Sequence, residues 1–186
     1  MKRMLLVAVL AAVAATGCMT GVKQVYHTAA GASARYYEVQ SLGGSSALDR
    51  FTVVGVEGFD TSPMLGAVPS SFVGPVQTAI VRKLTETKMF QSVTKGTPGR
   101  GGLLIRGKFM DFDSGGSSLR AVGFGVNPFL TAQIQCIDTA SNRVLGVAMV
   151  TGTIKSAVRT GSGELADGVG KAVKGLVEHH HTKRAE

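Results

Sequence analysis

The stretch LLIRGKFMDF at residues 103–112 alternates apolar and polar side chains with a period of two. In an extended strand, successive side chains point to opposite faces. Leu103, Ile105 and Phe109 would therefore face one side, and Arg106 and Lys108 the other. This alternation predicts a strand with one buried face and one face in contact with water, as antiparallel sheets often have.

A second alternating stretch, LTAQIQC at residues 130–136, follows the same pattern. The next residues, DTASN at 138–142, form a turn cluster in which Asn142 suits a left-handed backbone conformation. Residues 144–154 then form a returning strand. We therefore predict an antiparallel hairpin.

Four further segments complete the expected fold. Residues 51–56 (FTVVGV) are short, apolar and β-branched, as in a buried strand, and residues 90–93 form a short strand. A helix opens at Gly74-Pro75 and carries an apolar stripe through about Lys88, and a second striped helix covers residues 164–177. The fold class is therefore α+β: a mixed, mostly antiparallel sheet with two helices packed on one face, in the order β-α-β-β-β-β-α.

The beginning of the chain has the pattern of a secretory signal peptide. A basic start at residues 1–3 precedes an apolar run at residues 4–15, and small residues (ATG, 15–17) lead to Cys18. The apolar run is shorter than the about 20 residues that a membrane-spanning helix needs. A cysteine at this position resembles the processing site of bacterial lipoproteins, in which lipid, palmitate included, is attached to the cysteine after cleavage. We therefore expect Cys18 to be lipidated and no other cofactor to be bound.

This pattern divides the chain into four parts: a signal peptide at 1–17, a lipid-anchored tether at 18–50, a periplasmic domain at 51–178, and a polar tail of histidine and basic residues at 179–186. The tether is rich in Gly, Ala and Ser. Alternatively, Tyr36 to Val39 pairs with the domain as an edge strand.

The charge of the chain restricts its partners. The 186 residues carry a formal net charge of +8, which falls to +6 once Lys2 and Arg3 leave with the signal peptide. Such a balance suits anionic lipid headgroups or acidic polymers. No compact basic run with interleaved aromatic residues is present, so we expect no binding to nucleic acid.

The cysteines are Cys18 and Cys136. Lipid on Cys18 would leave Cys136 without an intramolecular disulfide partner. The alternation at residues 130–136 places Cys136 on the apolar face, where it would behave as a small hydrophobic residue and not as a nucleophile.

Two acidic residues are the weak candidates for a metal site. Asp111 and Asp113 are two apart, so a strand would point both carboxylates to one side, where they could hold a divalent cation. The turn sequence SGGS follows directly, and aspartates before turns commonly accept hydrogen bonds from backbone N–H groups. The turn interpretation is favoured. The alternative is a metal-dependent hydrolase that uses Asp111 and Asp113, with Asp138 as an optional third residue.

Two other sequence features are weaker candidates for a site. His179, His180 and His181 are consecutive, and three consecutive histidines do not converge on one metal, so a solvated tail is favoured. The segment GFGVNP at residues 123–128 lacks the strand-to-helix context of a phosphate-binding loop. Within it, Phe124 is either a core residue or an exposed docking residue, and Arg120 just upstream is the first choice for a functional charge.

Several motifs of the domain resemble a family of bacterial lipoproteins catalogued as domain of unknown function 4410. The resembling segments are LLIRG (103–107), GGSSLR (115–120), GFG (123–125), ID (137–138) and NRVL (142–145). The resemblance covers roughly residues 51–178. It implies an outer-membrane lipoprotein with a periplasmic α/β domain, and it implies no substrate.

These observations favour a non-catalytic module, anchored through lipid to the periplasmic side of the outer membrane. It would bind protein or cell-envelope partners, in keeping with an oligomer. Met19 after the cysteine is not the aspartate that resembles an inner-membrane retention signal.

Overall fold

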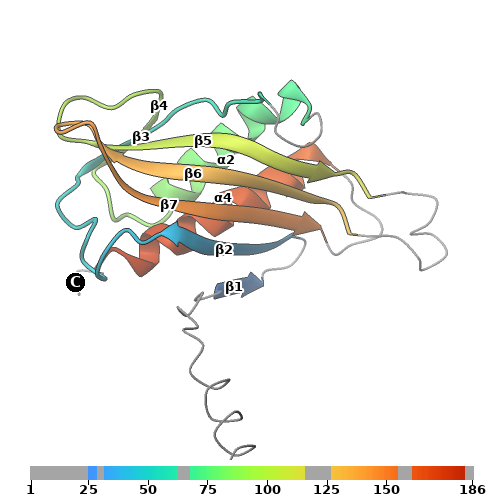
Figure 1. Ribbon diagram of the computed structural model, residues 1–186, viewed down its shortest axis with the longest axis horizontal. Helices are drawn as coiled ribbons and strands as arrows, with labels where there is room; N and C mark the ends of the chain where they lie inside the picture. The colour runs from blue at the N-terminus through green and yellow to red at the C-terminus, as the bar shows by residue number, and fades with distance from the viewer. Residues whose placement is uncertain (1–24, 29–31, 63–67, 116–126, 155–160, 183–186) are drawn as a thin grey trace, which may run out of the picture.

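The computed structural model of the chain describes residues 25–28, 32–62, 68–115, 127–154 and 161–182. Across these residues, seven strands form one sheet in the order β1-β2-β7-β6-β5-β3-β4 (Figure 1). The strands are β1 Val25–Thr28, β2 Ala32–Gln40, β3 Val53–Val56, β4 Ser92–Lys95, β5 Leu103–Asp113, β6 Phe129–Asp138 and β7 Arg143–Ile154. The helical elements are a 3-10 turn η2 (Ser70–Phe72) and the helices α2 (Val73–Thr85) and α4 (Ser162–His179).

β5, β6 and β7 form an antiparallel meander in the centre of the sheet, and its second half is the predicted hairpin. β5 pairs with β6, and β6 with β7, both antiparallel. The turn between β6 and β7 places Asn142 at φ 52°, in the left-handed region expected for it. The alternation of residues 103–112 and 130–136 therefore predicted the strands β5 and β6 correctly, and the turn cluster at residues 138–142 predicted the hairpin of β6 with β7.

β3 gives the sheet its mixed character. It lies between β4 and β5 and is parallel to both. A parallel connection requires a crossover, and α2 supplies it between β3 and β4. The predicted order of elements from β3 to α4 is confirmed.

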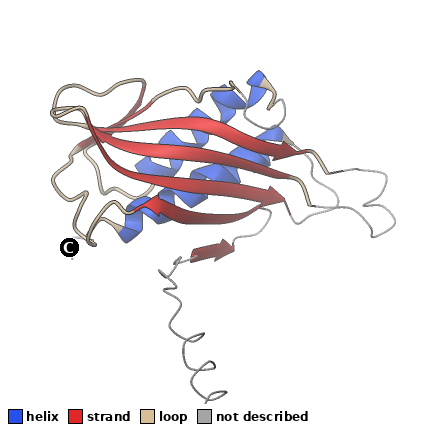
Figure 2. Ribbon diagram, in the orientation of Figure 1, coloured by secondary structure: helices blue, strands red, loops and turns tan. Residues whose placement is uncertain are grey.

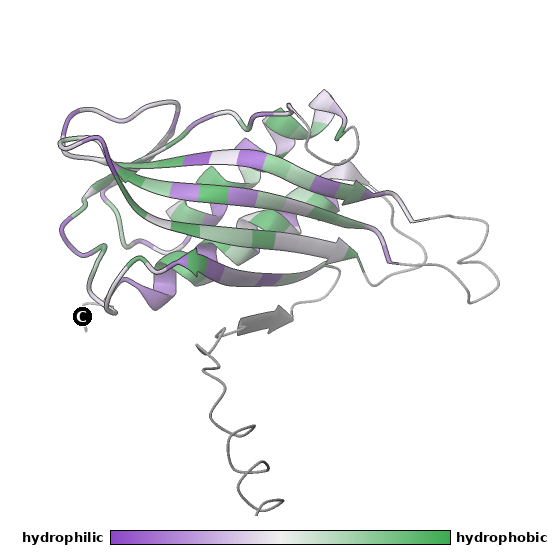
Figure 3. Ribbon diagram, in the orientation of Figure 1, coloured by the Kyte–Doolittle hydropathy of each residue, from purple (hydrophilic) through white to green (hydrophobic). Residues whose placement is uncertain are grey.

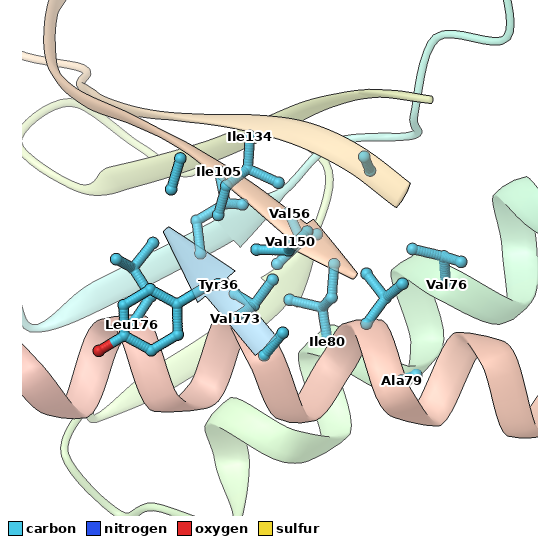
Figure 4. Close-up of a cluster of buried hydrophobic side chains, with 14 of the residues drawn as sticks. Tyr36, Val56, Val76, Ala79, Ile80, Ile105, Ile134, Val150, Val173 and Leu176 are labelled. Atoms are coloured by element: carbon cyan, nitrogen blue, oxygen red, sulfur yellow. The ribbon is translucent and has the colours of Figure 1, made fainter. Parts of the chain in front are cut away.

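Both helices cover the same face of the sheet, as Figure 2 shows by the helices that lie behind the strands. α4 packs on β7 and β2, and α2 packs beside α4. Figure 4 shows the core between these layers. Its fully buried side chains come from sheet and helices alike, among them Val56, Ile105, Ile134, Ile80 and Leu176.

The helices approach the sheet and each other closely because small residues face the contacts. A Cβ added to Gly168 of α4 would lie 2.7 Å from the Cα of Gly152 on β7. A Cβ added to Gly170 would lie 3.0 Å from backbone atoms of Ala79 on α2. These two glycines therefore set the distance of α4 from the sheet and from α2.

The structure corrects the predicted start of the domain. Residues 32–50 are not a tether, because β2 pairs with β7 over most of its length and is flanked on its other side by β1. Ala32, Ala34 and Tyr36 are buried, so the small residues of this segment fill space under α4. The alternative prediction of a strand at Tyr36 to Val39 is correct in its secondary structure, but this strand is internal and not at the edge of the sheet.

The structure also corrects the predicted solvated tail. α4 continues through His179, and His180 is only 3% exposed. The backbone carbonyl of His180 accepts a hydrogen bond from the N–H of Leu48 at 3.0 Å. Residues 179–182 thus pack against the segment that follows β2. None of the described helices combines the length and the apolar character that crossing a membrane requires.

Candidate functional site

The face of the sheet opposite the helices is covered by none of the described helices (Figure 2). Side chains from four strands form rows across this open face. One row runs from Tyr37 on β2 to Met149 on β7, Gln133 on β6 and Lys108 on β5, as the strand register dictates. On β5 and β6, the open face is therefore built from the water-facing positions that the period-two pattern predicted.

The open face has a polar half on β5 and β6, and an apolar strip on β2 and β7 that consists of Tyr37, Val39, Val147 and Met149. Figure 3 shows purple, hydrophilic segments on β5 and β6, whereas β7 is mostly green or pale. Tyr37 and Val39 of β2 are the exposed large hydrophobic side chains of the described residues, at 39% and 60% exposure. The half-buried Val147 and Met149 lie beside them on β7.

The polar half contains a groove of about 420 Å³. It forms where residues 57–60 continue alongside β5, with the N–H of Asp60 bonded to the carbonyl of Gly107 at 2.9 Å. Gly107 is required there, because a Cβ would lie 2.2 Å from the ring of Phe59. The polar side chains of the groove are Glu57, Asp60, Arg106, Lys108, Gln133 and Gln135.

The charges of the groove are partly paired. Arg106 Nε lies 2.6 Å from Glu57 Oε2, and Thr97 Oγ1 donates to Glu57 Oε1 at 2.8 Å. The hydrogen bond from Arg106 lowers the pKa of Glu57, and the same contact raises the pKa of Arg106. The carboxylate thus stays ionised, and the groove offers amide and cationic donors to a polar ligand.

A larger crevice of about 770 Å³ lies on the other side of the molecule, between the residues that follow α2 and the last turns of α4. Its lining includes Glu86, Lys88, Lys174 and Glu178. Lys174 Nζ is 3.8 Å from Glu178 Oε1. The mixed charge of this crevice indicates no particular ligand.

The three aspartates of the hydrolase alternative do not converge. Asp111 Oδ1 accepts the N–H of Phe112, and Asp113 Oδ1 accepts the N–H of Gly115 at 2.6 Å, which agrees with the turn interpretation. Asp138 lies at the opposite end of the meander from Asp113. Asp113 pairs with Phe129, and Asp138 follows Phe129 by nine residues along β6, which is about 30 Å at 3.4 Å per residue. It bonds to Arg50 at 3.0 Å.

Cys136 behaves as the sequence predicted. It is 1% exposed, and burial followed by the charge of Glu38 raises its pKa to about 12. It is therefore a thiol packed in the core and not a nucleophile. Three other predicted site residues, Cys18, Arg120 and Phe124, lie outside the described residues.

The histidines at the end of α4 form contacts that the sequence did not suggest. Nε2 of His180 lies 2.9 Å from Oε1 of Glu38, and Nδ1 lies 3.2 Å from the carbonyl oxygen of Gly44. Burial acts to raise the pKa of Glu38, but the bond to His180 and the N–H of Leu42 together lower it. A buried histidine thus joins α4 to β2.

Potential metal ligands also gather there. One ligand atom each from Glu38, His179 and His180 lies within 4.8 Å of the others, and this is the only such group of three among the residues that the structure describes. Sequence reasoning missed it because Glu38 and His180 are 142 positions apart. The only feature of the sequence that pointed to a metal site here was the presence of the consecutive histidines at residues 179–181.

A family model identifies the family of the chain, and solved structures of low sequence identity show its fold. The family model described as "Domain of unknown function (DUF4410)" matches residues 38–157. No curated protein matches the chain. The PelC dodecamer from Paraburkholderia phytofirmans is similar at 14% identity and a TM-score of 0.53, over 73% of this chain and 94% of that chain.

Two further solved structures have the same kind of similarity. A variant PelC dodecamer from the same organism gives 14% identity and a TM-score of 0.53, over 78% of this chain and 96% of that chain. Protein XCC0632 from Xanthomonas campestris, of the family model DUF330, gives 12% identity and a TM-score of 0.44, over 69% and 80%.

The family match includes β2 from Glu38 onward, all of the meander and the helix α2, which is well over half of the chain. The chain belongs to the family DUF4410.

Proposed function

We propose that this chain is a non-catalytic binding subunit of the bacterial cell envelope. Lipid on Cys18 would anchor it to the periplasmic face of the outer membrane, and it would bind protein or cell-envelope partners as part of an oligomer. The observation that carries the proposal is the open face of the sheet, which places an apolar strip beside a polar groove.

The side chains of the open face are of the kinds found in interfaces with a binding partner. Tyr37 and Val39 offer apolar area, and Tyr is among the residues enriched at interfaces. The groove beside them adds Arg106, Lys108, Gln133 and Gln135 as polar contacts. An apolar centre with polar groups at its side is the usual composition of a specific interface.

The anchor and the oligomer have separate support. The sequence before Cys18 supports lipidation and export. The fold is that of PelC, which was solved as a dodecamer, and this supports an assembly of several copies as a proposal for this chain too.

The hydrolase alternative receives less support. Asp138 lies about 30 Å from Asp113, and both Asp111 and Asp113 bond to nearby backbone N–H groups. Replacing Asp111 and Asp113 together by Asn tests the alternative. Loss of biological function with unchanged stability and unchanged partner recovery would favour the hydrolase over the binding subunit.

Cross-linking in cells tests the binding role directly. Wild-type protein should yield a defined oligomer or a co-purified envelope partner. Tyr37→Lys should reduce that recovery severalfold, because it places a charge in the apolar strip. The matched control is Thr78→Lys on the exposed side of α2, which should leave recovery unchanged. Equal recovery for both variants, or no oligomer and no partner for wild type, contradicts the proposal.

Mass spectrometry of the mature N-terminus tests the anchor. We expect a first residue Cys18 that carries acyl chains, and release of Cys18→Ser into the soluble fraction without detergent. Two acyl chains suffice for stable attachment, since each buried CH₂ contributes about 0.8 kcal/mol. An unmodified N-terminus at another residue would refute lipidation.

A further inference from the structure

We propose that Glu38, His179 and His180 form a structural binding site for a first-row divalent cation such as Zn²⁺. This site would join the end of α4 to β2. It is independent of the open face and of the proposed binding function.

The donor set suits such a metal. Imidazole nitrogens and a carboxylate oxygen are common zinc ligands, and two histidines with one glutamate leave a fourth position for water. The three potential ligand atoms lie within 4.8 Å of one another. Ligands of tetrahedral zinc are about 3.4 Å apart, so a small adjustment completes the geometry. His179 is exposed and can make that adjustment, and it also leaves an entry path.

The two inner ligands are already held in orientation. His180 Nε2 points at Glu38 Oε1 at 2.9 Å, while its Nδ1 faces the carbonyl oxygen of Gly44 at 3.2 Å. Glu38 uses its other oxygen, Oε2, to accept the N–H of Leu42 at 3.0 Å. Metal-bound histidines usually donate their second ring N–H to such a carbonyl, and ligating carboxylates are themselves hydrogen-bonded.

The end of the helix explains why two adjacent histidines can converge. Consecutive side chains in an α-helix diverge by about 100°. His179 is the last helical residue, and His180 leaves the helix at φ −109° and ψ 12°. Their rings meet in a T-shaped contact with centroids 4.9 Å apart. His181, by contrast, turns away toward Asp49, 3.4 Å from its Nδ1.

Calorimetric titration with Zn²⁺ tests the proposal on the untagged chain that carries Cys18→Ser and its natural C-terminus. We expect one ion per chain. Glu38→Gln and His179→Gln should each weaken the affinity by at least about tenfold, the size of effect typical of altered metal-site residues. His181→Gln is the matched control and should leave the affinity within about twofold of that of the parent chain.

Two results would overturn the proposal. One is the absence of saturable binding. The other is an adventitious pattern, in which His181→Gln weakens binding as much as His179→Gln while Glu38→Gln has no effect. If Glu38→Gln does not fold, X-ray absorption of the zinc-loaded parent chain decides: two imidazoles with oxygen ligands support the site, and three imidazoles refute it.

Discussion

Cys136 occupies a fully packed position on β6, and its chemistry follows from that position. The side chain is 1% exposed, and Ile134 precedes it on the same buried face. Burial raises the pKa of its thiol to about 12. Only the thiolate reacts readily with disulfide reagents. Two factors therefore protect Cys136 from disulfide reagents: the reagent has no access to the buried side chain, and the thiol stays protonated.

A labelling experiment checks this protection. In the Cys18→Ser background, Cys136 should not react with a disulfide reagent such as DTNB in the native state between pH 7 and pH 10, because the folded pKa lies near 12. It should react rapidly once urea unfolds the chain, since an ordinary cysteine pKa is about 8.5. A native labelling rate that rises tenfold per pH unit to a plateau near pH 8.5 would contradict the burial.

At the scale of elements, the contact of α4 with β7 depends on a pair of glycines. Gly168→Ala adds a Cβ that would lie 2.7 Å from the Cα of Gly152, so strands or helix must shift. We expect the free energy of unfolding to fall by about 1–2 kcal/mol, because overpacking exceeds the gain in helix propensity. Gly163→Ala in the same helix meets no atom within 4 Å and should be neutral or stabilising. Urea denaturation of both variants gives the comparison, and equal stabilities would refute the close contact.

A second element-scale contact is electrostatic and joins α2 to α4. Asp167 Oδ1 lies 2.6 Å from Arg82 Nη2 and 3.6 Å from Lys83 Nζ, and Oδ2 lies 2.9 Å from Lys171 Nζ. Burial acts to raise the pKa of Asp167, but the hydrogen bond from Lys171 and the charges of the three cations together lower it.

A carboxyl group with a lowered folded-state pKa stabilises the fold at pH values above its unfolded pKa of about 3.9. That contribution disappears as the pH falls through the folded pKa. Asp167→Asn should therefore lower the free energy of unfolding at pH 6, on the order of 1 kcal/mol for a partly exposed pair. The difference from wild type should vanish toward pH 2. Denaturation curves across this range would contradict the network if the two proteins differed equally at every pH.

The elements differ in how far the sequence could predict them. β5 and β6 have clear alternation, and the pairing of β6 with β7 followed from the short turn between them. β2 was predicted only in part, and only as the alternative to a tether, because its buried positions include Ala32 and Ala34, whose small side chains give little hydrophobic signal. Contacts such as Glu38 with His180 depend on the packing of α4 onto β2. No local pattern carries that information.

For the whole molecule, the position of β2 changes where the domain begins. A chain that starts at residue 51 would lack β2 and would expose the twelve residues of β7 as an edge. It would also lose the buried side chains of Tyr36 and Leu48 from the core. We expect this truncation to aggregate and to lack a cooperative thermal transition, since long exposed edges promote association.

A chain that starts at residue 24 keeps β2 and serves as the matched control. It should elute as a defined species and melt cooperatively, as measured by size-exclusion chromatography and circular dichroism. Cooperative melting of the chain that starts at residue 51 would show that the folded domain begins there and does not require β2.

The two outermost strands of the sheet are short. β1 and β4 are four residues long, and β4 ends in the exposed Lys95. Short edge strands offer few unpaired backbone groups to a neighbouring strand, and an exposed lysine such as Lys95 further disfavours pairing. A sheet with such borders resists extension by strand addition from another copy. Subunits of this kind would therefore meet through their side chains, across a face or at an end, and an assembly built that way could dissociate without unpairing any strand of the fold.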